Sequence, residues 1–266
     1  MKMRLSAVLL LLLLFAGALA LLLSRYDYAF QDRDAIMAPS SAQHWTGTDE
    51  VGRDRLVRVS AALFIGLTGA SAAAAITTLI AALFGFMAAF STQCIANILL
   101  FVSDLILSLP WIFLLMMARS MLPLTASPLE TAVMTFLILA ALGWPACART
   151  IYRGALALRS AEWMIHGYAS GLKTLQLIRL HLLPHLRSLL LPQFLICIPA
   201  FIMAEANLGA LGLGVGEPLP SWGAMLMELD NSAQLAQTRL LYLPIALLVV
   251  VLLILESFTS EVKTDA

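Results

Sequence analysis

Hydrophobic residues fall into six long runs along this chain, and polar segments separate them. The runs cover approximately residues 5–23, 60–90, 98–122, 131–147, 189–208 and 240–258. A helix needs about 20 mostly apolar residues to cross a bilayer, and each run is close to or above that length. The pattern therefore predicts an all-α, polytopic membrane protein with about six transmembrane helices.

Composition supports this fold class. Of the 266 residues, 61% are hydrophobic and only 12% are charged, whereas a soluble domain has about 25% charged residues. The 16 basic residues balance the 16 acidic ones, so net charge gives no indication of a nucleic-acid partner, and membrane lipid is the expected surrounding. Cys94, Cys147 and Cys197 lie far apart in or beside apolar runs, which predicts small packing residues rather than disulfides.

The first apolar run follows Lys2 and Arg4. A secretory signal has a shorter core, about 7–15 residues, and a small-residue cleavage site. Ala18-Leu19-Ala20 resembles such a site, but the apolar run continues to Leu23. We therefore predict an uncleaved first helix with its N-terminus inside the cell.

Residues 149–187 form a basic segment between two apolar runs. Glu162 is its one acid, against Arg149, Arg153, Arg159, Lys173, Arg179 and Arg187. Basic loops of modest length stay on the cytoplasmic side, so this segment and both termini are predicted inside. Residues 209–239, with three acids and one base, suit an outside loop. Residues 25–58 also fall outside, although their five arginines fit the rule poorly.

The basic segment has a helical pattern broken by one glycine. Apolar or small residues recur at helical spacing before and after Gly171, and the second stretch runs to Pro184. Two short helices hinged at Gly171 are the expected structure. Such a helix pair can dock into a groove on a soluble partner, or it can lie on the lipid headgroups; the pattern fits both.

Ionisable residues within apolar runs are candidate pathway residues, because charges are costly inside a membrane. Asp104 precedes Pro110 in the third run, and Glu205 lies near the end of the fifth. Proline frees a backbone carbonyl and can kink a helix, so a kinked third helix with a buried carboxylate could line a pathway. The alternative for both carboxylates is an interhelical hydrogen bond or snorkelling.

A dense charge cluster precedes the second run. Thr48 or Asp49 is the expected helix N-cap, and Asp54 is expected to form ion pairs with Arg53, Arg55 and Arg58. The competing interpretation is contact with a delivered substrate or its carrier protein. The glycines between 209 and 216 predict an irregular, close-packed outer gate beside Trp222, which is expected to anchor at the membrane interface.

Candidate catalytic and metal sites are not found in the sequence. A nucleotide-binding loop needs a Gly-Lys pair, and the chain contains none. His181 and His185 are four residues apart, but zinc needs further ligands. We therefore expect no enzyme activity, no cofactor and no metal in this chain, so that any ATP and Mg²⁺ would be bound by partner subunits.

Several motifs resemble a known family when they are taken in chain order. The coupling loop of bacterial ABC-importer permeases resembles Ser160-Ala161-Glu162-Trp163, Gly171-Leu172-Lys173-Thr174-Leu175 and Arg179-Leu180-His181-Leu182-Leu183-Pro184. The dipeptide/oligopeptide/nickel branch of that family is similar at residues 44–54 and 144–153, at Glu205-Ala206-Asn207-Leu208, at residues 211–215 and at Pro220-Ser221-Trp222-Gly223. One departure is Ile165-His166-Gly167, where the family usually carries Glu-Ala-Ala.

The resemblance implies three sets of functional residues. ATPase coupling falls on Ala161, Glu162, Ile165, His166, Gly167, Gly171, Leu172, Leu175, Ile178, Leu182 and Pro184. A pathway or gate falls on Asp104, Pro110, Glu205, Gly212, Gly214, Ser221 and Trp222. The periplasmic loop contributes Gly47, Thr48, Asp49, Gly52, Arg53 and Asp54.

The resemblance also implies a division of the chain and a set of partners. Residues 1–24 are expected to be an N-terminal transmembrane helix, 25–58 a periplasmic loop, 59–258 a permease core with the coupling loop at 149–187, and 259–266 a tail. The partners would be a second homologous permease, two cytoplasmic ATPases and a periplasmic or lipid-anchored binding protein at the bacterial inner membrane. Short peptides are the expected substrate; the alternatives are nickel or a metallophore, or a passive channel.

Overall fold

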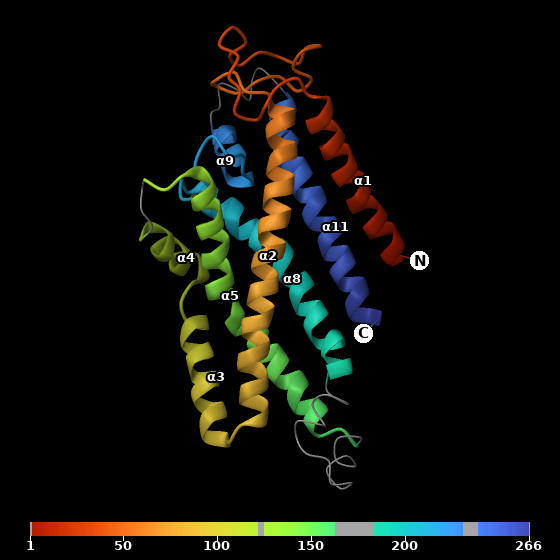
Figure 1. The fold of residues 1–266 in the computed structure, drawn as a ribbon, viewed down its shortest axis with the longest axis vertical. Helices are drawn as coiled ribbons and strands as arrows, with labels where there is room; N and C mark the ends of the chain where they lie inside the picture. Colours follow the sequence, from red (N-terminus) through yellow and green to blue (C-terminus); the bar gives the residue numbers. More distant parts are fainter. Residues whose placement is uncertain (1, 122–124, 163–182, 231–238, 266) are drawn as a thin grey trace.

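The computed structural model describes residues 2–121, 125–162, 183–230 and 239–265, and every regular element in these ranges is a helix (Figure 1). The long helices are α1 (Lys2–Leu23), α2 (Arg55–Phe90), α5 (Pro128–Arg159), α8 (Leu183–Ala210) and α11 (Leu243–Asp265). Shorter ones are α3 (Gln93–Leu107), α4 (Trp111–Ser120), α9 (Trp222–Met227), η2 (Glu228–Asp230) and η3 (Arg239–Tyr242). The all-α prediction is confirmed.

Five of these helices are long and apolar enough to cross a membrane, and α3 and α4 form a pair bent by 83° that counts as a sixth crossing if taken together. The pair starts near the end of α2 and reaches the loop after α8. At the end where α2 finishes and α3 begins, Arg159 donates a hydrogen bond to the Ala89 carbonyl at 2.8 Å. At the other end, Arg119 of α4 donates to the carbonyls of Leu213 and Gly214 in the loop after α8. About six crossings are therefore confirmed.

The predicted kink in the third crossing is a full break. Pro110 is the N-cap residue of α4 and lies outside both helices. Proline has no N–H to donate, and its ring clashes with the preceding turn of a helix. The chain at Pro110 therefore changes direction between two short helices instead of bending one long helix.

Small residues bring α2 and α5 close together at the centre of the bundle. A Cβ atom on Gly69 would lie 2.2 Å from the Phe136 ring, and one on Gly85 would lie 2.9 Å from the Ala148 carbonyl oxygen. Thr77 adds a hydrogen bond to the carbonyl of Ala140 at 3.1 Å. Close approach of this kind gives the van der Waals contact that holds helices together in lipid.

The helices α5 and α8 pack along their length. Cys147 and Cys197 are both buried, are not joined by a disulfide, and have Sγ atoms 3.3 Å apart. A Cβ atom on Gly143 would lie 2.7 Å from the Phe201 ring, and one on Gly154 would lie 2.4 Å from Leu189. The expectation of packing residues is confirmed for these two cysteines by their burial, and it is wrong for Cys94, which is exposed.

Several helices extend beyond the apolar runs. The helix α2 begins at Arg55, α5 continues through Arg149 and Arg153 to Arg159, and α11 continues to Asp265. A helix can carry polar turns where it leaves the bilayer, so the apolar runs define the crossings and not the helix ends. The expected helix pair at Gly171 lies outside the described residues.

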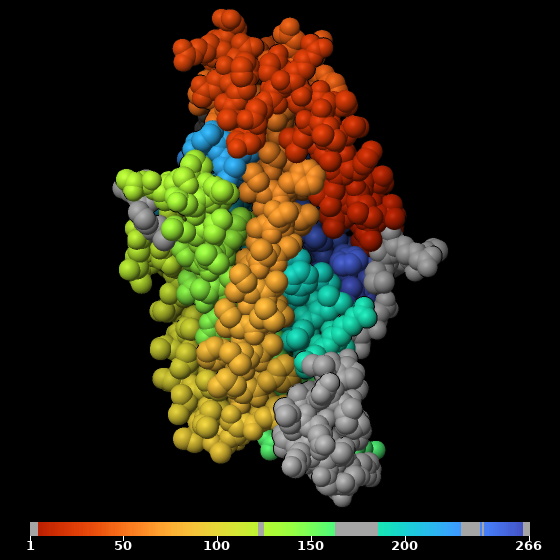
Figure 2. Space-filling view, in the orientation of Figure 1, coloured from red at the N-terminus to blue at the C-terminus, as the bar shows by residue number. Residues whose placement is uncertain are grey.

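The two termini lie toward the same end of the bundle (Figure 1). There α1 packs against α11, and Ser6 donates a hydrogen bond to the Glu261 carboxylate at 2.8 Å. Residues 24–54 and 211–221 lie at the other end, which we call the loop end; Figure 2 shows residues 24–54 covering the top of the bundle there.

Candidate functional site

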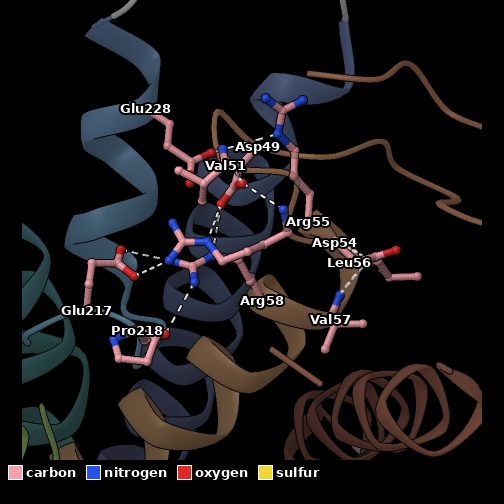
Figure 3. A network of polar contacts seen from close by, with 11 residues as sticks. Asp49, Val51, Asp54, Arg55, Leu56, Val57, Arg58, Glu217, Pro218 and Glu228 are labelled. Carbon is pink, nitrogen blue, oxygen red and sulfur yellow. Dashed lines mark hydrogen bonds and ion pairs between the residues drawn. The ribbon is translucent and has the colours of Figure 1, made fainter. Parts of the chain in front are cut away.

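Three arginines and three carboxylates meet at the loop end, where residues 24–54, α2 and the segment after α8 come together (Figure 3). We call this group the polar cluster. Its members are Asp49, Arg53, Arg55, Arg58, Glu217 and Glu228. Because its charges are equal in number and opposite in sign, the cluster can be buried without leaving net charge in a poorly solvated site.

Arg58 is at the centre of the polar cluster and is fully buried. Its Nη2 atom is 2.9 Å from Glu217 Oε1, its Nη1 atom donates to the Pro218 carbonyl at 3.3 Å, and its Nε atom is 3.7 Å from Asp49 Oδ2. The guanidinium therefore connects the first loop to the segment after α8, which are more than 150 residues apart in the chain.

Arg53 and Arg55 flank this centre. Arg53 Nε donates to Asp49 Oδ2 at 2.6 Å, and its Nη1 atom pairs with Glu217. Burial lowers the pKa of Arg53, but the hydrogen bonds and charges of Asp49 and Glu217 outweigh it, so the net shift is upward. Arg55 Nε lies 3.7 Å from Glu228 Oε2. Arg53 is therefore held as a cation.

The start of α2 is capped by Asp54, not by Thr48 or Asp49 as predicted from the sequence. Asp54 Oδ1 accepts hydrogen bonds from the N–H groups of Leu56 at 2.9 Å and Val57 at 3.1 Å. The other oxygen is 2.9 Å from His44 Nδ1. The predicted ion pairs of Asp54 with the arginines are therefore wrong, because its two oxygens are already used.

The side chains of Asp49 and Thr48 form hydrogen bonds within the loop and do not cap α2. Asp49 Oδ1 accepts from the N–H groups of Val51 at 3.0 Å and Arg53 at 2.8 Å. The Thr48 hydroxyl donates to the Ala35 carbonyl and accepts from the Ala38 N–H. These contacts shape the turn so that the second oxygen of Asp49 faces the arginines.

Gly47 and Gly52 allow the loop to fold this tightly. Both have positive φ, +80° and +84°, where residues with a Cβ atom are strained. A Cβ atom would lie 2.5 Å from the Ala38 carbonyl oxygen at Gly47 and 2.0 Å from the Asp32 carbonyl oxygen at Gly52. Both glycines were predicted to be functional residues of the loop, and the structure shows that neither position has room for a side chain.

The segment after α8 packs α9 back against the bundle. Gly212 has a φ of +75°, and the Leu213 N–H donates to the Leu208 carbonyl at 2.8 Å, which ends α8. Ser221 caps α9 by accepting a hydrogen bond from the Ala224 N–H at 3.2 Å. A Cβ atom on Gly214 would lie 2.5 Å from the Cα atom of Gly209. The prediction of a close-packed glycine segment agrees with this geometry.

Trp222 does not anchor at the membrane interface, contrary to expectation. Its side chain is only 1% exposed, and a Cβ atom on Gly66 of α2 would lie 2.7 Å from its Nε1 atom. The indole is therefore a packing element between α9 and α2. Glu205 lies next to the same turn, 1% exposed, with the Ser221 hydroxyl and the N–H groups of Trp222 and Gly223 as its polar neighbours.

Asp104 lies away from the polar cluster and pairs with Arg149. The distance between Asp104 Oδ1 and Arg149 Nη2 is 2.5 Å, and the pair connects α3 to α5. The sequence singled out Asp104 but assigned Arg149 to the basic segment, because Arg149 follows an apolar run directly. Continuation of α5 through Arg149 is what brings the two side chains together.

Three hollows lie along one face of α8. A cavity of about 500 Å³ lies between the α3–α4 break, α5 and α8. Two more, of about 550 and 530 Å³, lie beside α4 and beside α11. All three share Ala200 of α8, and Met203 and Asn207 are exposed on the same face. The described part of the chain therefore leaves one face of α8 uncovered.

Comparison with known proteins accounts for this architecture. Residues 81–259 match the family described as "Binding-protein-dependent transport system inner membrane component". The chain belongs to this family. It is a transport permease family of membrane proteins, not a family of enzymes, and the predicted permease fold is confirmed.

Individual permeases align over most of the chain. The chain is 30% identical over 221 residues to the oligopeptide transport system permease protein OppC of Bacillus subtilis, covering 83% of this chain and 70% of that protein. It is 31% identical over 225 residues to the dipeptide transport system permease protein DppC of the same species, covering 84% and 68%. It is 28% identical to OppC of Escherichia coli over 251 residues, covering 93% and 80%.

The polar cluster is expected to make the stability of this permease depend on pH. Burial raises the pKa of Glu228 to about 7, and the Asp49 carboxylate adds to the increase, while Arg58, Arg55 and Arg53 oppose it. The folded protein therefore holds this proton more tightly than the unfolded chain, so stability falls as pH rises toward and through 7. Between pH 6 and pH 8 we expect a loss of about 1 kcal/mol.

Melting temperatures of the purified protein at the two pH values test this. Glu228→Gln is expected to remove most of the loss, because the amide does not ionise. Glu50→Gln, in the loop before α2 at the same end of the bundle and exposed, is the control and should keep the wild-type dependence. An unchanged slope in Glu228→Gln would contradict the assignment.

Proposed function

We propose that the chain is one of two permease subunits of an ATP-driven, binding-protein-dependent importer of dipeptides or oligopeptides in the bacterial inner membrane. The proposal rests on family membership together with one observation, the hollows along a face of α8 that the described residues leave uncovered. Such a face is expected where a second subunit packs. The substrate class rests on the relatives named as oligopeptide and dipeptide permeases.

A second homologous permease would cover the exposed α8 face. The hollows share Ala200, and Asn207 adds an exposed polar side chain to the same face. Polar side chains within membrane helices usually face protein or water rather than lipid. A pathway between two such faces would then be lined from both subunits, with Asp104 and Pro110 at its side.

Cytoplasmic ATPases would act on the segment between α5 and α8. The helix α5 ends at Arg159 and α8 begins at Leu183, both at the end of the bundle opposite the loop end. The proposed coupling residues Ile165, His166 and Gly167, like those from Gly171 to Leu182, lie outside the described residues. In this proposal the loop end would be periplasmic, and residues 24–54 would receive the binding protein.

The importer reconstituted with both permeases, the ATPases and the binding protein tests the coupling. Gly171→Pro or Leu175→Asp is expected to reduce peptide uptake at least tenfold and to weaken retention of the ATPases, because either change would disrupt the helix pair that the sequence predicts at these positions. The melting temperature of the bundle should stay within the error of the wild type.

Ser188→Ala, on α8 beyond the proposed docking residues, is the control and should transport normally. Wild-type uptake in both coupling variants would contradict the proposed docking. Uptake of nickel without uptake of peptides, or solute flux without ATP, would overturn the assignment as a peptide importer.

A further inference from the structure

A cavity of about 480 Å³ lies at the loop end, where α1 stops and α2 begins (Figure 1). The two helices touch farther from the loop, since a Cβ atom on Gly17 of α1 would lie 3.3 Å from the Leu63 side chain of α2. Nearer the loop, Ala20 and Leu23 of α1 and Leu56 of α2 line the cavity. The cavity therefore opens between two membrane helices beyond the point where they touch.

The lining of this cavity changes from apolar to polar at the edge of the membrane. The apolar span of α1 ends at Leu23, and the next two residues, Ser24 and Arg25, line the same cavity. Tyr26 and Trp45 also line it. Tyrosine and tryptophan are enriched where a membrane meets water, because one part of each side chain is apolar and the other is hydrated. The cavity therefore lies at the level of the lipid headgroups.

Arg25 brings a positive charge to the cavity that has no protein partner in the described part of the chain. Its side chain is exposed, and the ion pairs of the described residues do not include it. Arg53, Arg55 and Arg58 differ, because each of them lies beside a carboxylate. Asp54 is the one acid in the cavity lining, and its carboxylate already caps α2. The cavity thus has room for an anion beside Arg25.

The apolar surface around the cavity favours lipid over a soluble anion. Trp45 is 59% exposed, and Leu22, the neighbour of Leu23 in the chain, is 82% exposed. Covering apolar surface stabilises a complex by about 25 cal/mol per Å². A soluble anion covers little of this surface, whereas an acyl chain can cover much of it. The occupant that fits both features carries a negative group and an apolar tail.

We propose that this cavity binds an anionic phospholipid. The phosphate accepts hydrogen bonds from the Arg25 guanidinium, whose planar fork matches two phosphate oxygens. The amide of Gln43, which is exposed and lines the cavity, is a further donor. The acyl chains continue past Ala20 and Leu23 into the bilayer. A lipid with one net negative charge neutralises Arg25, whereas a zwitterionic lipid adds a second cation beside it.

Native mass spectrometry of the detergent-purified chain, titrated with phosphatidylglycerol, tests the role of Arg25. Arg25→Gln is expected to raise the lipid concentration for half occupancy about fivefold, because one arginine at the membrane surface contributes an attraction of that size. Arg33→Gln is the matched control: it removes the same charge from the same loop, is exposed and lies outside the cavity lining. It should bind lipid as the wild type does. Equal binding by the two variants would overturn the proposal.

A local measurement separates this cavity from lipid bound elsewhere on the chain. The fluorescence of Trp45 is obtained as the difference between the wild type and Trp45→Phe. Phosphatidylglycerol with acyl chains brominated near the headgroup is expected to quench it, and Arg25→Gln should need about five times more lipid for the same quenching. Brominated phosphatidylcholine should quench less at the same concentration.

Excess glycerol 3-phosphate, which has the headgroup chemistry but no acyl chains, should leave the quenching unchanged. Loss of quenching on its addition would show a site for free phosphate, and equal quenching by phosphatidylcholine would show apolar contact without headgroup recognition. Either result would overturn the proposal. Neither measurement involves transport, so the outcome is independent of the proposed function.

Discussion

Replacing Arg58 by methionine is expected to lower the free energy of unfolding by about 3 kcal/mol. Arg58 is fully buried and pairs with Glu217 and Asp49. Removing one partner of a buried ion pair costs about 3–5 kcal/mol, because it leaves an unpaired charge in a poorly solvated site. The lower value applies here, because Arg53 still reaches both carboxylates and Glu217 is 49% exposed.

Thermal unfolding of the detergent-purified protein measures this effect. Arg33→Met, in the loop that precedes α2 and exposed, is the control and should change stability by less than about 0.5 kcal/mol. Adding Glu217→Gln to Arg58→Met should recover part of the loss, since it removes one of the two carboxylates left without Arg58. Equal melting temperatures for Arg58→Met and Arg33→Met would refute the central role of Arg58.

Gly209→Ala is expected to have a comparable effect by steric means. A Cβ atom at this position would lie 2.3 Å from the Cα atom of Gly223, and two backbones cannot move apart as a side chain can. Overpacking a close contact typically costs about 1–3 kcal/mol, and the upper value is expected here. Because α9 would be pushed from α8, we also expect Trp222 to become accessible to solvent and transport to be lost.

Gly216→Ala is the matched control in the same segment. The nearest atom to a Cβ there is 3.6 Å away, an ordinary contact, and φ is not positive. Its stability and uptake should match the wild type. If Gly209→Ala behaved like Gly216→Ala in melting temperature and uptake, the close approach of α8 and α9 would not be a requirement of the fold.

The crossings could be predicted from the sequence, because polar side chains are excluded from lipid and each crossing therefore appears as a continuous apolar run. The break at Pro110 was placed correctly, but its size was not, because the 83° turn depends on how α3 and α4 pack against α5. Helix ends were placed too early. The last turns of α5 and α11 are polar but still helical, and the apolar pattern detects only the part inside the membrane.

The residues of the polar cluster could be predicted only in part. Asp49 and Arg53 could be predicted, because charged residues are clustered around them in the sequence. Glu217 and Glu228 could not, because they lie more than 150 residues further along the chain and a single sequence does not show which distant charges pair. The helix cap was misassigned for a similar reason. Thr48, Asp49 and Asp54 are all good N-cap residues, and the tight turn at Gly52 decides which one precedes α2.

The contact between α5 and α8 has a mechanical consequence. Cys147 and Cys197 touch near the middle of both helices, and Gly143 and Gly154 hold the same two helices close to Phe201 and Leu189. Neither helix can slide along the other without losing these fits. A force applied between Arg159 and Leu183 would therefore tilt α5 and α8 together as one rigid unit. Gly209 lies near the other end of α8, so the same tilt would move Gly209 and α9, which packs against it.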